Sequence, residues 1–291
     1  MRTLCVSLIA VALLAGSAIG VAGQSEVETR PAAIASVDEL FSVTLDEAAI
    51  PEDLAGILFF NKQYPTDLDI TYGPGFVPPN TFVRYVETGE LGVRPNSAIV
   101  VMRAGAESTD AEVLAAGEET VVAQGDTFVM ADIPYDEFGP EALGEMWTPA
   151  EDAEVVGFAI RETSRCCSMS HAGMVSPWYV TLSGSAVDEM RGQPVTLRVL
   201  RWDMSPGASL PLSAETGAML RYVEEGVVTA SKVSEEAAST PAEEPFTVEF
   251  TAGATIYPLS LDAGQLVAFS NTGDEPAVVY ELRVESARDA S

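Results

Sequence analysis

The chain has 291 residues, and its 44 acidic residues outnumber its 15 basic ones, so its formal net charge at pH 7 is −29. A surface this negative repels phosphates and anionic lipid headgroups, which excludes nucleic acids and anionic membrane surfaces as partners. The length exceeds one average domain and fits two domains of roughly 110 to 130 residues each.

The N-terminus carries the pattern of an export signal. Met1 and Arg2 precede an uncharged, mostly apolar stretch, Thr3–Gly23, whose last residues are small enough for a signal peptidase site. Residues 1–23 are therefore predicted to be a signal peptide, and the protein is predicted to be secreted and extracytoplasmic. The alternative is an uncleaved N-terminal anchor, because about 20 apolar residues can span a bilayer. No later stretch is long and apolar enough to do so.

Residues 24–39 are predicted to form a disordered lead. Apolar residues within Ser36–Glu47 also stand near helical spacing, which favours a short helix that ends before Pro51.

From Ile57 onward the pattern is that of β-strands, with short apolar or alternating runs separated by Gly, Pro and Asn clusters at roughly 10-residue spacing. The runs are Gly56–Phe60, Thr81–Val86, Ser97–Met102, Thr120–Met130, Val155–Ile160, Val195–Trp202, Met219–Val223, Val227–Lys232, Phe246–Tyr257, Leu266–Ser270 and Val278–Val284. No strand–helix–strand alternation is present, which excludes the parallel α/β folds. The predicted fold class is all-β, a sandwich or barrel.

Residues 164–194 are predicted to link two halves, and they hold Cys166, Cys167 and the single histidine, His171. Two cysteines beyond residue 23 cannot form a disulfide framework. They form a strained vicinal disulfide, pair with another chain, remain thiols, or hold a soft metal with His171; these alternatives stay open.

The two halves repeat one another. Phe82–Leu91 and Met219–Val228 share an Arg-Tyr-Val-Glu core with a glycine in register, and Thr120–Val129 matches Val248–Tyr257. A third pair, Glu151–Ile160 and Gly273–Leu282, follows in the same order. The order of three recurring segments indicates a duplicated module.

These residues resemble the bicupins, which are proteins with two cupin jelly-roll barrels of the RmlC-like type. The second half carries the resemblance in Ser205–Pro211, Tyr222–Gly226 and Asp262–Ala277, and the first half in Tyr72–Gly75, Tyr85–Gly89 and Gln124–Asp126. The resemblance implies two tandem barrels, residues 40–163 and residues 195–287.

The family's metal ligands are missing. In metal-binding cupins a His-x-His pair, a glutamate and a further histidine converge inside the barrel. The histidine positions fall near Ser213 and Glu215, near Phe76 and Pro78, and at Val267 and Glu145, and none of them is a histidine. Neither barrel is predicted to bind a metal, and no cofactor is predicted.

Five residues are the candidate ligand-binding set: Arg84 and Tyr85 in the first half, and Glu215, Arg221 and Tyr222 in the second. Each arginine is the sole cation of an apolar strand, where it would either reach an anion inside the barrel or pair with a carboxylate at the sheet surface. Glu87 and Glu224 stand at the hairpins and are predicted to be solvated.

The predicted function is that of an exported, metal-free bicupin that acts as a small-molecule or carbohydrate binding module or as a structural module. The alternative is a metal-independent isomerase or epimerase that uses Glu215 with Tyr222 or Tyr257 as acid and base. Enzyme activity is not the favoured interpretation. No membrane contact is predicted beyond an N-terminal anchor, and a homodimer is left open.

Overall fold

The computed structural model describes residues 35–47, 50–71, 81–106, 110–131, 143–163, 175–188, 190–211, 218–234, 247–258 and 265–286. All of them belong to one compact unit, Ala32–Ser291. The predicted signal peptide, most of the lead, Glu215, Cys166, Cys167 and His171 lie outside the described residues, so the predictions about them stay predictions.

The described residues form an all-β structure with one short helix, α2 (Ser185–Asp188). The strands up to residue 163 are β1 (Ser36–Leu45), β2 (Leu54–Tyr64), β3 (Asp69–Thr71), β4 (Thr81–Thr88), β5 (Glu90–Arg94), β6 (Ile99–Met102), β7 (Glu112–Leu114), β8 (Thr120–Ala123), β9 (Thr127–Met130), β10 (Glu145–Trp147) and β11 (Ala153–Glu162). They are followed by β12 (Val175–Leu182), β13 (Val195–Met204), β14 (Ala218–Glu225), β15 (Val227–Ser234), β16 (Thr247–Thr251), β17 (Thr255–Ile256), β18 (Gln265–Asn271) and β19 (Ala277–Ser286). Every strand run expected from the sequence is occupied by at least one of these strands.

The described strands form four sheets, and five inner and three outer strands follow the same order in both halves; β3, β6 and β7 have no counterpart in the second half. The first inner sheet is β12-β2-β11-β4-β9-β6-β7, and the second inner sheet is β1-β13-β19-β14-β17. The first outer sheet is β3-β10-β5-β8, and the second outer sheet is β16-β15-β18. The shared Arg-Tyr-Val-Glu core lies on β4 in the first half and on β14 in the second. β4 lies between β11 and β9, and β14 lies between the equivalent strands, β19 and β17. The sheet order thus agrees with the duplication inferred from the sequence.

The first residues of the described chain are a strand, and two expectations about them are wrong. Ser36–Leu45 is neither a disordered lead at residues 36–39 nor a short helix; it is β1, paired antiparallel with β13. Phe41, Val43 and Leu45 alternate along it and pack into one core, which is a period of two residues. The spacing of these apolar residues is compatible with a helix and with a strand. The segment is a strand because it pairs with β13.

The halves exchange strands reciprocally. β1 precedes the first half in sequence yet pairs with β13 of the second inner sheet, and β12 precedes the second half yet pairs with β2 of the first inner sheet. The predicted linker, residues 164–194, therefore contains a strand that is integral to the first half. The first inner sheet thus includes β12, which adjoins the second half in sequence, and the second inner sheet includes β1, which adjoins the first half.

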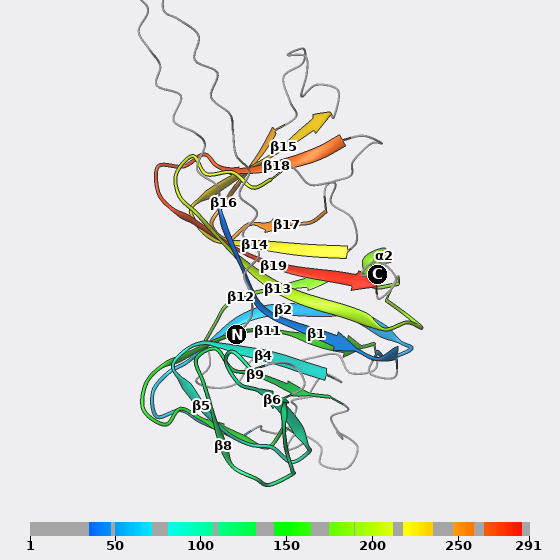
Figure 1. The fold of residues 1–291 in the computed structure, drawn as a ribbon, viewed down its shortest axis with the longest axis vertical. Helices are drawn as coiled ribbons and strands as arrows, with labels where there is room; N and C mark the ends of the chain where they lie inside the picture. The colour runs from blue at the N-terminus through cyan, green and yellow to red at the C-terminus, as the bar shows by residue number, and fades with distance from the viewer. Residues whose placement is uncertain are drawn as a thin grey trace, which may run out of the picture. The chain divides into compact units, whose positions relative to one another are not determined.

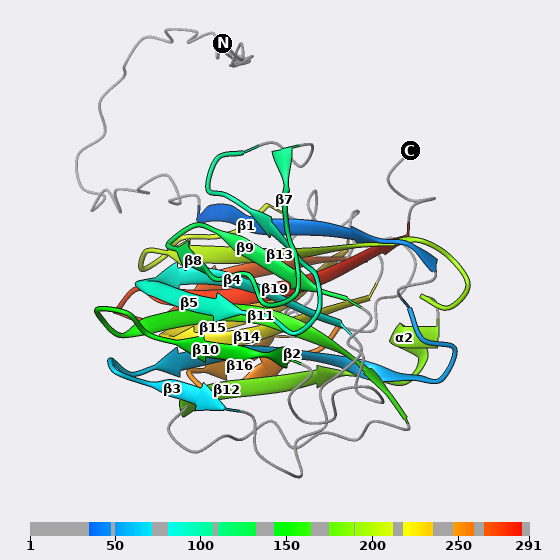
Figure 2. The ribbon, with the colours of Figure 1, turned by 90° about the horizontal axis from the view of Figure 1, so that it is seen from below.

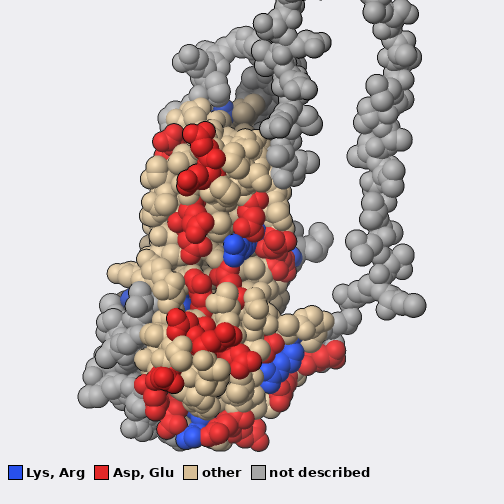
Figure 3. All heavy atoms as spheres, turned by 90° about the vertical axis from the view of Figure 1, so that its left-hand side faces the viewer, with Lys and Arg blue, Asp and Glu red and all other residues tan. Residues whose placement is uncertain are grey.

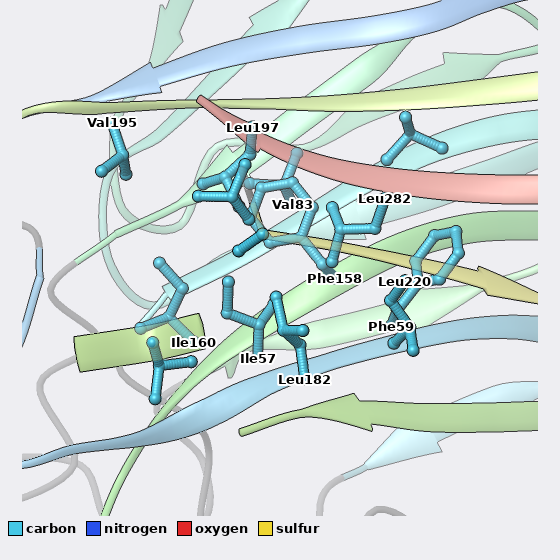
Figure 4. Close-up of a cluster of buried hydrophobic side chains, with 14 of the residues drawn as sticks. Ile57, Phe59, Val83, Phe158, Ile160, Leu182, Val195, Leu197, Leu220 and Leu282 are labelled. Atoms are coloured by element: carbon cyan, nitrogen blue, oxygen red, sulfur yellow. The ribbon is translucent and has the colours of Figure 1, made fainter. Parts of the chain in front are cut away.

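The buried residues of the described chain form three apolar cores, which separate the four sheets. One lies between the first outer and first inner sheets, a second between the two inner sheets, and a third between the second inner and second outer sheets. Figure 1 shows this order, with β15 and β18 at one end, β5 and β8 at the other, and the inner strands between them; Figure 2 shows the strands from below. The middle core joins residues of both halves, among them Phe59, Val83, Phe158, Leu220 and Leu282 (Figure 4).

Acidic side chains are spread over the face seen in Figure 3, with few basic ones among them. Within the described part of the chain, no helix has the length and apolar character needed to cross a membrane.

Candidate functional site: a carboxylate cluster between the halves

Arg221 lies inside the second half, in the core between the inner and outer sheets. Its Nε donates a 2.6 Å hydrogen bond to Oε2 of Glu281, and both side chains are buried. The guanidinium carbon lies 5.0 Å from the ring centre of Trp202 and 4.5 Å from that of Phe269. A cation held between two rings and one carboxylate is satisfied within the protein.

Arg84 occupies the equivalent place in the first half. Its guanidinium carbon lies 4.6 Å from the ring centre of Phe82 and 5.7 Å from that of Phe128. Its Nη1 lies 2.8 Å from the sulfur of Met146. Arg221 thus pairs with a carboxylate, as one of the two alternatives expected, but neither arginine lies at a sheet surface, because the alternation of β4 and β14 turns both side chains inward.

Tyr85 and Tyr222 point the opposite way, toward the junction between the halves. Tyr222 stacks on Trp178 with ring centres 4.4 Å apart, and Tyr85 stacks on Phe41 at 6.0 Å. Tyr257, the other tyrosine of the proposed isomerase set, is 53% exposed.

Beside these tyrosines, carboxylates from both halves gather at the junction. Glu87 of β4 is buried, although it was expected to be solvated at its hairpin. The hydroxyl of Tyr280, on β19, donates to both carboxylate oxygens of Glu87 at 2.7 Å, and Arg201 of β13 forms an ion pair with it. Strands of the second half thus hold a carboxylate of the first.

Glu224, the repeat partner of Glu87, is held in return by the first inner sheet. Trp178 Nε1, on β12, donates to Oε1 of Glu224 at 3.3 Å. Asn61 Nδ2, on β2, donates to Glu154 at 2.6 Å and approaches Glu224 at 3.5 Å. We call Glu87, Glu154, Glu224, Asn61, Trp178, Arg201 and Tyr280 the junction cluster.

Burial changes the acidity of this cluster. Desolvation raises the pKa of Glu87, and the Tyr280 hydroxyl and Arg201 offset only part of this effect. Desolvation also raises the pKa of Glu224, and the nearby charges of Glu87 and Glu154 raise it further. Burial, followed by the Glu87 charge, raises the pKa of Tyr280 above its usual range. Glu87 and Glu224 therefore retain their protons to higher pH than free carboxyl groups do.

Carboxyl groups of raised pKa are the groups that general acid–base catalysis uses, and here they lie between packed sheets. A hollow of about 360 Å³ reaches Glu154 from the side of Tyr64, Thr88 and Asp152. Its lining does not include Glu87 or Glu224. The geometry of the cluster is that of a polar connection between the halves.

The residues of the described interiors do not fit the metal that the bicupin resemblance implies. Each interior already holds a buried guanidinium, which repels a second cation, and the described residues contain no group of three or more His, Cys, Asp or Glu side chains placed to hold a metal ion. The absence of metal from the protein stays a prediction.

Sequence reasoning named Arg84, Tyr85, Arg221 and Tyr222 but missed most of the junction cluster. Glu87 and Glu224 recur in the repeat, and that recurrence within strands was the available signal. Arg201, Tyr280, Asn61 and Trp178 carry no local motif, since only the pairing of β12 with β2 and of β13 with β19 brings them together.

No family model matches the sequence, and a search of curated proteins found no relative. Among solved structures, the chain is similar to an oxalate decarboxylase from Bacillus subtilis, with 10% identity and a TM-score of 0.36 over 89% of this chain and 76% of that one. It is also similar to the vicilin of hazelnut, Corylus avellana, with 8% identity and a TM-score of 0.31 over 79% of this chain and 73% of that one. A cupin barrel protein from Salinispora arenicola matches 32% of this chain and 65% of its own, with 20% identity and a TM-score of 0.23. Similarities at these scores do not define a function, so the function of this chain has to be inferred from its own geometry.

Proposed function

We propose that the chain is an exported, metal-free module of the bicupin type that acts as a scaffold, with each pair of inner and outer sheets forming one jelly-roll barrel. One observation carries the proposal: the interior of each half is filled by an arginine packed against aromatic rings. Arg84 lies against Phe82 and Phe128, and Arg221 lies between Trp202 and Phe269.

A filled interior disfavours the functions that need an open one. A small ligand would have to displace the Arg221 guanidinium from Glu281, which would leave a buried charge without its partner. A metal ion would have to approach a fixed positive charge. A scaffold requires neither step.

The junction cluster supports the same proposal. Its cross-half hydrogen bonds join Glu87 to Tyr280 and Glu224 to Trp178, and they border the apolar core shared by the two inner sheets. Such a connection suits a module that presents its surfaces in a fixed arrangement.

Replacement of Arg84 and Arg221 by methionine tests the proposal against ligand binding at the predicted set of Arg84, Tyr85, Glu215, Arg221 and Tyr222. The scaffold proposal expects each variant to unfold at a lower temperature than the unmodified chain. It also expects that organic anions raise the unfolding temperature of none of these proteins, and that any rise given by a small sugar is equal in the variants and in the unmodified chain.

Ligand binding in the interior would give a different result. The unmodified chain would then gain thermal stability from one of these compounds, and the methionine variants would lose that gain while keeping the fold.

Elemental analysis of the purified protein tests the metal-free part of the proposal. We expect no stoichiometric iron, manganese or zinc. A stoichiometric metal that persists after Cys166, Cys167 and His171 are all replaced by alanine would contradict it.

A further inference from the structure

The solvent-facing side of the first outer sheet carries an ordered row of side chains around Trp147. Trp147 of β10 stands directly opposite Gly92 of β5 on one side and Asp69 of β3 on the other. A Cβ atom added at Gly92 would lie 1.9 Å from Cε2 of Trp147, so the indole occupies the space above the β5 backbone. Glycine at this position lets the ring lie against the sheet.

The neighbouring row of the same face is charged. Arg94 stands opposite Glu145, and its Nη1 donates to Oε2 of Glu145 at 2.7 Å. Its Nε donates to Oε1 of Glu119 at 2.8 Å. These ion pairs hold the planar polar groups in fixed positions while all three side chains stay exposed to solvent.

Together these side chains line a hollow of about 350 Å³, formed by Asp69, Arg94, Glu119, Glu145 and Trp147. Its volume falls in the range of small-molecule sites. We propose that this hollow binds a neutral pyranose unit of a polysaccharide.

The chemistry of the lining matches that ligand. The C–H face of a pyranose ring is apolar and packs on the face of an indole, while its hydroxyl groups both donate and accept hydrogen bonds. Carboxylates accept from such hydroxyls, and the guanidinium donates to them in a fixed plane. Three carboxylates against one guanidinium leave the lining negative, which disfavours uronic and sulfated sugars.

This site goes beyond the proposed scaffold function and does not depend on the interiors. The two proposals can fail separately, because the residues around Trp147 face away from Arg84 and from the core of the first half.

Affinity gel electrophoresis of the full chain in xylan, galactomannan or mixed-linkage glucan tests the proposal. We expect retardation by at least one of these neutral polysaccharides. Trp147→Ala should weaken that binding by about tenfold or more, because it removes the stacking surface. The matched control is Tyr179→Ala, which removes an aromatic side chain that is 67% exposed on β12, and it should bind as the unmodified chain does.

A second measurement keeps the test independent of how the Trp147 variant folds. The chain has three tryptophans, and Trp178 and Trp202 are only 5% and 3% exposed. Tryptophan emission should therefore change when the retarding polysaccharide is added. Glu119→Gln, at an exposed position, should reduce the affinity about threefold by weakening one charge-assisted hydrogen bond.

Four results would overturn the proposal. The first is no retardation by any neutral polysaccharide. The second is binding that survives in both Trp147→Ala and Glu119→Gln. The third is retention by chitosan alone that disappears at high salt, since a chain of this charge attracts any polycation. The fourth is retention by polygalacturonate, which would contradict the charge argument.

Discussion

At the scale of single residues, the chain places charged groups where most proteins place apolar ones. Arg221 and Glu281 are buried together. Arg283, two residues beyond Glu281 on β19, forms a second ion pair with it. A buried pair of this kind contributes little relative to an apolar pair of the same volume, but loss of one partner is costly.

Glu281→Leu should therefore lower the free energy of unfolding by about 3 to 5 kcal/mol, because it leaves the Arg221 guanidinium buried without its carboxylate. The double variant Arg221→Met, Glu281→Leu should recover most of that loss. Glu285→Leu, also on β19, removes a more exposed ion pair with Arg198 of β13 and should cost less than about 1 kcal/mol. Urea unfolding measures all three, and equal losses in the first and second variants would contradict the argument.

The junction cluster should make the stability of the folded protein depend on pH. Burial raises the pKa of Glu87 above its ordinary value of 4.5, so the folded state binds the proton more tightly than the unfolded state does. The stability that this group contributes is complete below that value and is lost as the pH rises through the raised pKa. The thermal unfolding temperature should accordingly fall as the pH rises above the ordinary value of 4.5 and through the raised pKa of Glu87.

Glu87→Gln isolates this contribution from the general repulsion of an acidic chain. The fall with pH should be shallower in this variant, because glutamine keeps the neutral shape at every pH. Glu275→Gln removes an exposed carboxylate and should keep the original slope. A Glu87→Gln profile that runs parallel to that control would contradict the assignment.

At the scale of elements, the repeated hairpins β4–β5 and β14–β15 turn at glycines with positive φ, 73° at Gly89 and 76° at Gly226. A Cβ atom at Gly226 would also lie 2.5 Å from the carbonyl oxygen of Pro276. Gly207 has the same φ of 76° but nothing within 4 Å of that position. Comparing substitutions at Gly226 and Gly207 therefore separates the cost of positive φ from the cost of the clash with Pro276.

Gly226→Ala should destabilise the protein by about 1 to 3 kcal/mol, and Gly207→Ala by about 1 kcal/mol. Chemical denaturation of both variants gives the difference. Equal effects would mean that the chain relaxes around Pro276 and that only φ matters.

The elements also show how far the sequence alone could lead. The glycine turns and the alternating runs, such as Val155–Ile160, are local signals, and the strands formed where they predicted. β12 was missed because its neighbours in the sequence resemble a linker, and it is a strand only through its pairing with β2. Glu87 was expected in solvent because nothing local records that Tyr280 and Arg201 cover it.

At the scale of the whole described unit, strand exchange makes each half incomplete without the other. The second inner sheet needs β1 from the start of the chain, and the first needs β12 from beyond residue 163. The core between the inner sheets would also be exposed if the halves separated, and it contains large apolar side chains such as Phe59, Phe158 and Leu220. An exposed face of that kind leads to association rather than to a stable monomer.

We therefore predict that residues 32–163 and residues 175–291, produced as separate fragments, do not fold alone. Residues 32–163 would carry β1 without its partner β13, and residues 175–291 would carry β12 without its partner β2. Coexpressed, the two fragments should form a soluble 1:1 complex with a cooperative thermal transition, because every strand pairing and the shared core are then restored. A fragment 175–291 to which residues 35–47 are fused is the control for β1 alone, and it should be more soluble than the unfused fragment. Cooperative unfolding of either fragment by itself would show that the halves are independent domains and that the exchanged strands are dispensable.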